Sequence, residues 1–470
     1  MSQSKLKIAY LSPVNPAQSG ISDYSEELLP YLSRYARIDL YLDDGLKPTN
    51  PSLSRDFQVF PASRFKRNAA GYDTCLYHMG NSAHHAYIYR ALLEHGKQGV
   101  LVLHDFVLHH FLIGQYLNNG RAQEYIKQMA RRYGPDGENI ARDVIKGKLA
   151  EALFSYPLCE EALEAAGAVL VHSRYARALI EKQYPGKPVG VARMGVPLPH
   201  LLNRQTARQS LNLPPDEFIL VSLGHLNPYK RLDSALWAFR AFSREYPNSR
   251  FVLVGSPSPN YNVKAMIKAL GLENRVYLAG YASDEQRAAY LAASDVCINL
   301  RYPTAGETSA SLLRIMGAGR PVLVSRTGAF EELPDDTCIK VDVDDTEEEL
   351  LLEYLRLLAR RPELAAQLGH NARRYVAEQG RLEDAAHDYY LFLCRMLNRS
   401  PEIAAPPAKP YHPEKPEEIV PHYSVKAAEP EESFPRHDLL EEVAQAAAEL
   451  ELSPDSPALQ KVAEVLRDLE

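Results

Sequence analysis

The feature that most constrains this chain is a repeated alternation between short apolar runs and longer segments with helical periodicity. The short runs are rich in β-branched and aliphatic residues, a composition that favours strands. The segments between them place apolar residues at the spacing of one helix face. Strands that alternate with helices form parallel sheets covered by helices, so the sequence predicts an α/β fold.

The alternation occurs as two series. Strands are expected at 7–12, 38–42, 74–78, 100–104, 169–172 and 189–194, and then at 218–223, 251–254, 276–279, 296–300, 322–325 and 339–341. Each series has about the length of a doubly wound domain, and 470 residues exceed one compact core. We expect Rossmann-like domains over 1–197 and 198–399 that face a ligand cleft. Whether a last helix at about 381–397 packs back on the first domain stays open.

Three other segments stand outside the alternation. The stretch between Asp105 and Ala166 has helical periodicity and no strand signal, so it is expected to elaborate the first domain. Residues 400–435 are rich in proline and poor in large aliphatic residues, which is typical of a linker. Residues 436–470 carry two narrow apolar stripes at helical spacing. A helical tail that docks on a protein partner or on the chain's own catalytic domains is open, and so is a loosely ordered tail.

Composition excludes several classes of function. The net charge is −7 and there is no sustained basic block, so nucleic acid is not an expected partner. The five cysteines are odd in number and lie among apolar neighbours, which indicates reduced thiols in a core. Residues 1–7 contain no apolar run ahead of a cleavage site, so no leader is expected, and the sequence has no run of eighteen uncharged apolar residues. A cytoplasmic protein is expected, and peripheral membrane contact stays open.

Three loops that follow expected strands carry candidate binding residues. The loop 12–24 leads through Gly20 into a helix and offers backbone N–H groups to an anion, although glycine also serves packing there. The loop 224–231 places Lys230 at the carboxyl end of a strand, where a cation could neutralise a phosphate. Arg231 is a second cation there, with a surface charge as its alternative role.

The third loop, 301–311, combines glycine, a carboxylate and two hydroxyl residues ahead of a helix. Gly306 frees the backbone, and Thr308 and Ser309 can cap the helix, whose N-terminus favours an anion. The loop therefore predicts a phosphate cradle with Glu307 beside it. Glu307 also has a simpler interpretation as a favourable charge in the first turn of a helix.

Seen in order, these residues resemble glycosyltransferase family 4 over roughly residues 8–397. The segments that carry the resemblance are Ser19-Gly20-Ile21-Ser22-Asp23-Tyr24-Ser25, Leu103-His104-Asp105, Val171-His172-Ser173, Gly224 with Lys230, Phe251-Val252-Leu253-Val254-Gly255, Ser294-Asp295-Val296 and Met316-Gly317-Ala318-Gly319-Arg320-Pro321-Val322. The resemblance implies the GT-B fold, a nucleotide-diphospho-sugar donor, transfer with retention of configuration, and no required metal or other cofactor. The loop 301–309 resembles a bacterial variant that reads Arg-Tyr-Pro-Thr-x-Gly-Glu-Thr-Ser.

The resemblance also implies roles for single residues. Lys230 corresponds to a lysine that binds the donor diphosphate, Gly20 to a glycine near the phosphates, and His104 to a histidine that contacts the sugar. Glu307 lies one place after the first of two family glutamates, where aligning on Met316 puts Gly306. The second, usually ribose-binding glutamate is replaced by Arg314, and the basic partner of the lysine by His225. These departures imply either altered donor recognition or lost activity.

The histidines do not predict a metal site. Their spacings repeat no known ligand pattern, and no set of Cys, Asp or Glu completes one. The residues concerned are His78, His84, His85, His104, His109 and His110. In the expected mechanism Lys230 and the helix N-terminus after Glu307 stabilise the departing diphosphate, and the acceptor attacks from the same face.

The sequence therefore predicts a retaining glycosyltransferase that moves a sugar to a saccharide or lipid-linked acceptor in cell-surface polysaccharide or glycolipid synthesis. A sugar-nucleotide epimerase of the same fold is one alternative. A non-catalytic scaffold that acts through its tail is another. The donor base, the sugar, the acceptor and the oligomeric state are not determined by the sequence.

Overall fold

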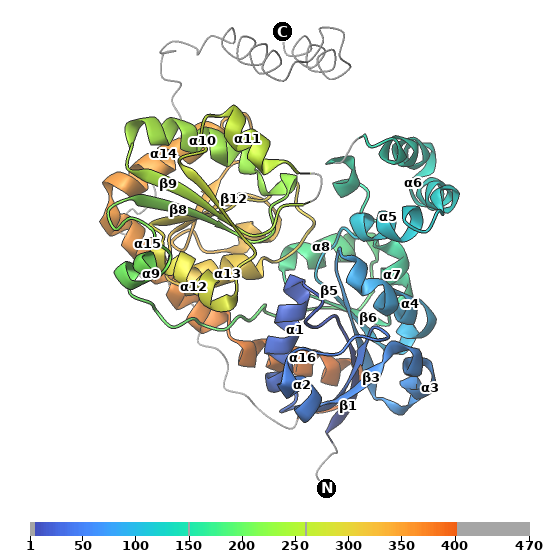
Figure 1. Cartoon of the computed structure of the whole chain (residues 1–470). Helices are drawn as coiled ribbons and strands as arrows, with labels where there is room; N and C mark the ends of the chain where they lie inside the picture. The colour runs from blue at the N-terminus through green and yellow to red at the C-terminus, as the bar shows by residue number, and fades with distance from the viewer. Residues whose placement is uncertain (1–4, 149–150, 259–260, 402–470) are drawn as a thin grey trace. The chain divides into compact units, whose positions relative to one another are not determined.

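A computed structural model describes residues 5–148, 151–258 and 261–401 (Figure 1). The predictions for the linker beyond residue 401 and for the helical tail at 436–470 lie outside the described residues. The described part contains two parallel sheets, each with helices packed on it. The expectation of two Rossmann-like α/β domains is therefore confirmed.

The first sheet has seven strands in the order β3-β2-β1-β4-β5-β6-β7. The strands are β1 Leu6–Leu11, β2 Ala36–Leu42, β3 Gln58–Pro61, β4 Thr74–Met79, β5 Val100–Leu103, β6 Ala168–Val171 and β7 Val189–Val191. All neighbouring strands run parallel, and the central strands β4, β5 and β6 are buried along their whole length. Burial on both faces explains why β5 and β6 read as continuous apolar runs in the sequence.

The second sheet has six parallel strands in the order β10-β9-β8-β11-β12-β13. The strands are β8 Phe218–Leu223, β9 Ser249–Val254, β10 Val276–Gly280, β11 Val296–Asn299, β12 Val322–Ser325 and β13 Ile339–Val341. In both sheets the strand order reverses beside the first strand of the series. Ligands of open α/β sheets bind at the carboxyl ends of the strands near such a reversal.

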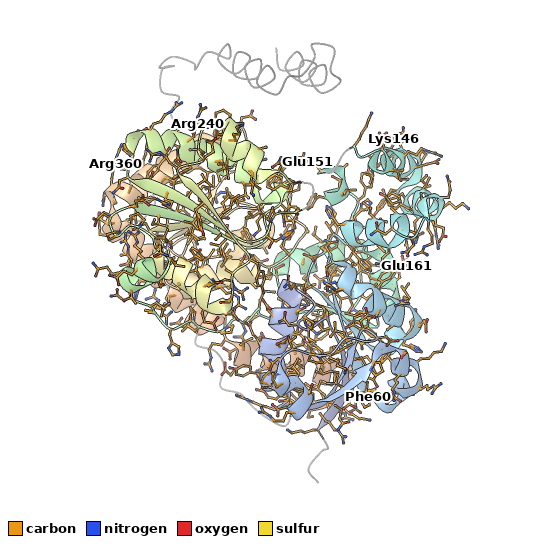
Figure 2. All side chains as sticks on the ribbon, in the orientation of Figure 1. Phe60, Lys146, Glu151, Glu161, Arg240 and Arg360 are labelled. Carbon is orange, nitrogen blue, oxygen red and sulfur yellow. The ribbon has the colours of Figure 1, made fainter. Side chains whose placement is uncertain are left out.

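One strand was missed by the sequence pattern. β3 pairs with β2 at the edge of the first sheet, and none of its four residues is fully buried. Its residue Phe60 is labelled in Figure 2. A short, half-exposed edge strand that ends in proline has neither the apolar run nor the alternation on which the prediction depends.

The helices follow the strands as the α/β pattern requires. They are α1 Gly20–Leu32, α2 Pro51–Asp56, α3 Phe65–Asn68, α4 Ala86–His95, α5 His109–Leu117, α6 Ala122–Ile145, α7 Glu160–Ala165, α8 Arg174–Gln183, α9 Arg204–Ser210, α10 Leu232–Glu245, α11 Val263–Ala269, α12 Asp284–Ala293, α13 Ala310–Gly317, α14 Glu347–Arg360, α15 Pro362–Gln379 and α16 Leu382–Met396. The described part of the stretch between Asp105 and Ala166 is helical without strands, as expected. Within α6 the helix is interrupted at Gly134, which has a φ of 68° and precedes Pro135.

The last described helix returns to the first domain. α16 lies against α1 (Figure 1), where the Tyr24 hydroxyl donates a hydrogen bond to the Tyr389 hydroxyl at 3.5 Å. Asp388 of α16 also pairs with Arg193, which follows β7, at 2.7 Å. The segment after β7 passes close to the start of α16, since a Cβ on Gly195 would lie 2.7 Å from the Leu382 Cα. The first domain is thus completed by residues from the far end of the described chain.

The five cysteines are buried and unpaired, as the sequence predicts. No helix in the described ranges is both long and apolar enough to cross a bilayer.

Candidate functional site

Loops from the two domains meet at the carboxyl ends of their sheets. The backbone N–H of Val107, after β5, donates a hydrogen bond to the Ala305 carbonyl, after β11, at 3.0 Å. The neighbouring Gly306 has a φ of 78°, and a Cβ there would lie 2.7 Å from the Phe106 Cβ. Both the backbone conformation and the close approach therefore favour glycine at position 306.

Lys230 lies in this region with its side chain buried. It ends a short 3₁₀ turn, Pro228–Lys230, between β8 and α10, and its Nζ donates a hydrogen bond to the Leu223 carbonyl at 3.1 Å. Gly224 makes room for it, because a Cβ on Gly224 would lie 2.5 Å from Nζ. Burial lowers the pKa of Lys230 well below its usual range, and Arg301 lowers it further while Glu307 opposes this. The ammonium group is thus held in a place where an anionic ligand would be favoured.

The N-terminus of α13 borders the same point. The position of a Cβ on Gly224 is 3.8 Å from Ser311 Oγ, in the first turn of that helix. Ser309 caps the helix by accepting a hydrogen bond from the Leu312 N–H at 3.2 Å. Asn299, at the end of β11, holds both serines, since its amide donates to Ser311 Oγ at 3.1 Å and its carbonyl accepts from Ser309 Oγ at 3.2 Å. A buried cation and a helix N-terminus therefore flank one glycine.

Glu307 is engaged within its own loop. One carboxylate oxygen lies 2.8 Å from Arg301 Nε, and the other accepts hydrogen bonds from the Ala305 N–H at 2.8 Å and the Thr304 hydroxyl at 3.3 Å. The carboxylate therefore fixes the loop 301–311 and holds Arg301. Arg301 is itself almost wholly buried, and its guanidinium lies over the Tyr229 ring at 5.5 Å.

Arg301 and Asp105 are site residues that the analysis of the sequence did not single out. Asp105 comes two places after β5, and its Oδ2 accepts a hydrogen bond from the Asn81 N–H at 2.9 Å. The pKa of Asp105 is raised to about 7, first by burial and then by the nearby Glu307, while the hydrogen bond from Asn81 and the charge of Arg301 oppose the rise. Each residue lies two places after the end of a buried strand, which was the available signal.

His104 lies in the first domain among other rings. Its Nε2 is 3.0 Å from His78 Nδ1, and its ring centroid is 5.5 Å from that of Tyr24 and 5.0 Å from that of His172. Burial lowers the pKa of His104 well below its usual range, and His172 and His78 lower it further. No described contact joins His104 to Lys230 or Glu307, although Asp105 follows it directly.

The remaining predicted residues are spread over different surroundings. Gly20 is exposed at the start of α1, and a Cβ there would meet no atom within 4 Å. His225 Nε2 lies 2.9 Å from Ser258 Oγ, and burial, then Lys230, lowers its pKa. Arg231 has a φ of 52° and pairs through Nε with Glu347 of α14 at 2.9 Å. Thr308 Oγ1 is buried and has no hydrogen bond within the described part of the chain.

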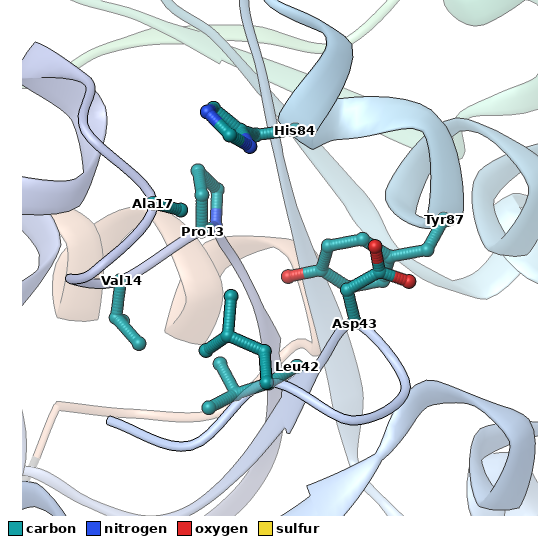
Figure 3. Close-up of a pocket in the computed structure, with 8 residues that line it drawn as sticks. Pro13, Val14, Ala17, Leu42, Asp43, His84 and Tyr87 are labelled. Carbon is teal, nitrogen blue, oxygen red and sulfur yellow. The ribbon is translucent and has the colours of Figure 1, made fainter. Parts of the chain in front are cut away.

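Two further features bear on ligands. Within the described ranges, no group of three or more His, Cys, Asp and Glu side chains is arranged to hold a metal ion. The hollow in Figure 3 has a volume of about 20 Å³, which is room for one water. It is lined by Pro13, Val14, Ala17, Leu42, Asp43, Leu46, His84 and Tyr87. It is too small for a nucleotide, and none of the loops around Lys230 lines it.

Arg314, which stands at the place of the missing second glutamate, reaches the first domain. Its Nη2 lies 2.5 Å from Glu27 Oε1 of α1, and each side chain is only 19 % exposed. A second pair joins α12 to the same helix, with Arg287 Nη2 3.5 Å from Asp23 Oδ2. Burial raises the pKa of Glu27, and Arg314 opposes that shift. The arginine therefore has an interdomain role in this fold.

We expect the Glu27–Arg314 pair to contribute measurable coupling energy. In a double-mutant cycle with Glu27→Gln and Arg314→Gln, the coupling should be about 1 kcal/mol, because the pair is largely screened from solvent. Chemical denaturation at low salt measures it. The exposed pair Arg142 and Glu138 in α6 is the control and should give about 0.3 kcal/mol. Equal values for both pairs would contradict the interdomain role.

Comparison with known proteins identifies the second domain. Residues 203–375 match the family model described as glycosyl transferases group 1. The chain is 34 % identical over 129 residues to MMP alpha-(1->4)-mannosyltransferase of Mycolicibacterium hassiacum, covering 27 % of this chain and 30 % of that protein. It is 22 % identical over 168 residues to alpha-monoglucosyldiacylglycerol synthase of Acholeplasma laidlawii, covering 36 % and 41 %. The matches thus span less than half the length of these curated relatives.

Solved structures share the architecture over most of the chain. Sucrose-phosphate synthase from Thermosynechococcus elongatus superposes with a TM-score of 0.60 at 18 % identity, covering 84 % of this chain and all of that one. Anabaena HepE in complex with UDP-glucose superposes with a TM-score of 0.59 at 15 % identity, covering 84 % and 99 %. These likenesses show the GT-B fold. The match of residues 203–375 to the family model and the curated glycosyltransferase relatives support a transferase enzyme.

Proposed function

We propose that this chain, whose second domain is a glycosyltransferase group 1 domain, is a retaining enzyme that transfers a sugar from a nucleotide-diphospho-sugar donor to a saccharide or lipid-linked acceptor. The observation that carries the proposal is the arrangement around Gly224. The buried ammonium of Lys230 and the N-terminus of α13 border the same glycine at the carboxyl end of the second sheet. Both features favour an anion at that point.

The chemistry follows from these charges. As the bond between the sugar and the diphosphate breaks, negative charge grows on the leaving group. Lys230 and the amide dipoles of α13 stabilise that charge from fixed positions, so little reorganisation is needed. Arg301, buried nearby and held by Glu307, adds positive potential. This set of groups can support departure of a diphosphate without a metal.

Retention is proposed to occur by attack of the acceptor on the face that the diphosphate leaves. A covalent route would need a carboxylate free to reach the anomeric carbon. Glu307 is a poor nucleophile here because both carboxylate oxygens are already engaged. One forms an ion pair with Arg301, and the other accepts hydrogen bonds from Ala305 and Thr304. The leaving phosphate is then the group that accepts the proton of the acceptor hydroxyl. Detection of a glycosyl adduct on Glu307 would overturn this route.

The relatives suggest where to begin the search for substrates. One solved structure of this fold binds UDP-glucose, one relative is a mannosyltransferase, and another is a glycolipid synthase. We propose a nucleotide-diphospho-hexose as donor, with UDP-glucose as the first candidate, and a role in polysaccharide or glycolipid synthesis. The proposed location is the cytoplasm, at the inner face of the membrane when the acceptor is lipid-linked.

A thermal-shift screen of UDP-, GDP- and ADP-sugars tests the donor site. A ligand at 100 times its Kd stabilises the folded state by about 2.7 kcal/mol, which should raise Tm by roughly 5 °C or more. One base should be preferred, and Lys230→Met should lose most of the shift. No shift with any nucleotide sugar would contradict the donor site. Conversion of the donor in the absence of acceptor would favour the epimerase instead.

The scaffold alternative makes the opposite prediction in cells. If the tail carried the function, Lys230→Met would leave the phenotype unchanged and deletion after Ser400 would abolish it. We expect Lys230→Met to abolish complementation of a deletion strain by the full-length chain.

A further inference from the structure

Three histidines gather where neighbouring strands of the first sheet end. His78 lies in β4, His104 follows β5 and His172 follows β6. The His104 ring centroid is 5.3 Å from that of His78 and 5.0 Å from that of His172. The surrounding rings are aromatic, with Tyr10 4.4 Å from His78 and Tyr389 6.2 Å from both His78 and His172. His78 is wholly buried, and His104 is 7 % exposed.

Burial keeps the three imidazole rings uncharged, and this fixes the number of N–H protons on each ring. Desolvation lowers the pKa of His78 and His104 well below the usual range and that of His172 to about 4. Each neutral ring therefore carries one N–H. His172 Nδ1 must hold its proton, because it lies 3.0 Å from the Ala192 carbonyl, which can only accept.

The pair His78 and His104 allows two proton arrangements. Their contact is 3.0 Å between His78 Nδ1 and His104 Nε2, so one of these nitrogens carries the proton. If His104 donates, the proton of His78 must sit on its Nε2. That nitrogen is buried and has no hydrogen-bond partner within the described residues. If His78 donates through Nδ1, the same buried nitrogen carries only a lone pair.

The second arrangement is the favoured one. A buried N–H without an acceptor forfeits a hydrogen bond to water, and such orphan donors are rarer than orphan acceptors. The aromatic rings of Tyr10 and Tyr389 beside His78 offer no strong acceptor in the ring plane. In this arrangement His78 Nδ1–H donates a hydrogen bond to His104 Nε2, and the single N–H proton of His104 therefore lies on its Nδ1. Within the described part of the chain, the side-chain hydrogen bond of His104 is made through Nε2, which leaves Nδ1 without a protein partner.

We propose that His78 is a positioning residue that fixes the tautomer of His104, so that His104 Nδ1–H donates a hydrogen bond to a hydroxyl oxygen of the sugar substrate. The proposal rests on the proposed transferase function for its ligand, but the tautomer rests on the fold alone. His104 directly precedes Asp105, whose carboxyl interacts electrostatically with Glu307 and Arg301 of the second domain. The sugar is expected on that side of the first sheet.

Substitutions at His78 separate hydrogen bonding from packing. His78→Asn can place an amide N–H near the former Nδ1 and should keep kcat/KM within about threefold. His78→Phe fills the same space without a donor and should lower kcat/KM about 10- to 100-fold, the usual effect of losing a partner that orients a site residue. The loss should fall mainly on kcat, with KM little changed. His84→Phe, at an exposed position, is the matched control and should have no effect.

A spectroscopic measurement tests the tautomer without any turnover. In the full-length protein labelled with ¹⁵N-histidine, the ¹⁵N spectrum should show His104 protonated at Nδ1 and bare at Nε2, with assignment by His104→Gln. His78→Phe should remove this fixed tautomer, and His78→Asn should restore it. A proton on His104 Nε2 in the wild type, or full activity of a folded His78→Phe variant, would overturn the proposal. Absence of transfer activity with the predicted spectrum would instead count against the transferase function.

Discussion

Replacing Lys230 with methionine should lower kcat/KM for sugar transfer about 10³-fold. Methionine has a similar length and fills the space beside Gly224, so packing changes little. What is lost is the cation that we propose faces the leaving diphosphate, and loss of one fixed group of this kind typically costs about 10²- to 10³-fold. Because an ammonium group carries a full charge and lies in a buried site, we expect the loss in kcat/KM to be at the upper end of this range. Steady-state transfer from the donor found by thermal shift measures it.

The same substitution should stabilise the protein without ligand. Because burial depresses the pKa of Lys230, the folded state disfavours the proton that the unfolded chain binds. The wild type therefore gains stability as the pH rises from the folded pKa toward 10.5. Lys230→Met removes this cost, so its advantage in Tm should be present at pH 7 and shrink toward pH 10.

Lys264→Met is the matched control for both measurements, since Lys264 is an exposed lysine on α11 of the same domain. It should change neither activity nor the pH dependence of Tm. Wild-type rates in Lys230→Met would remove the central premise of the proposed chemistry.

Replacing Asp105 with asparagine should raise the free energy of unfolding at pH 8 by about 4 kcal/mol. The pKa of Asp105 is raised from 3.8 to about 7, chiefly by burial and then by Glu307. The folded state thus holds the proton more tightly than the unfolded chain, and wild-type stability falls as the pH rises from about 4 to about 7. Each pKa unit corresponds to about 1.4 kcal/mol. Asparagine does not ionise in this pH range, so the stability of the variant should not decrease between about pH 4 and pH 7.

Chemical denaturation at several pH values between 4 and 8 tests the prediction. The curves for wild type and Asp105→Asn should meet near pH 4 and separate above it. Asp136→Asn, at an exposed position in α6, should follow the wild type throughout. Curves that stay parallel across this range would show that Asp105 is ionised at little cost.

The architecture could be predicted because buried parallel strands leave a local signal. Val100–Leu103 and Val322–Ser325 are apolar runs bounded by polar residues, and they were placed within a residue of their observed bounds. Lys230 was also placed correctly after β8, because a loop between strand and helix is evident in the sequence. β3 was missed because an edge strand packs on one side only and needs no apolar run.

The partners of the site residues could not be predicted. Asp105 and Glu307 interact across about 200 positions of sequence, and only the docking of two domains brings them together. Arg231 was the second candidate cation in the sequence, with a surface charge as its alternative role, and its guanidinium pairs with Glu347. The direction of the Arg231 side chain depends on a partner in a helix more than a hundred residues away, which the local sequence does not reveal.

The return of α16 to the first domain limits how this protein can be taken apart or recombined. A fragment ending near Pro197 would lack the helix that covers Tyr24, and would expose apolar surface to aggregation. A chimera that borrows its donor specificity from a relative should therefore exchange only the segment between Pro197 and Arg381. Residues 382–396 of this chain must be kept together with its amino-terminal half. The exchanged segment is therefore internal to the chain and does not extend to its carboxyl-terminal end.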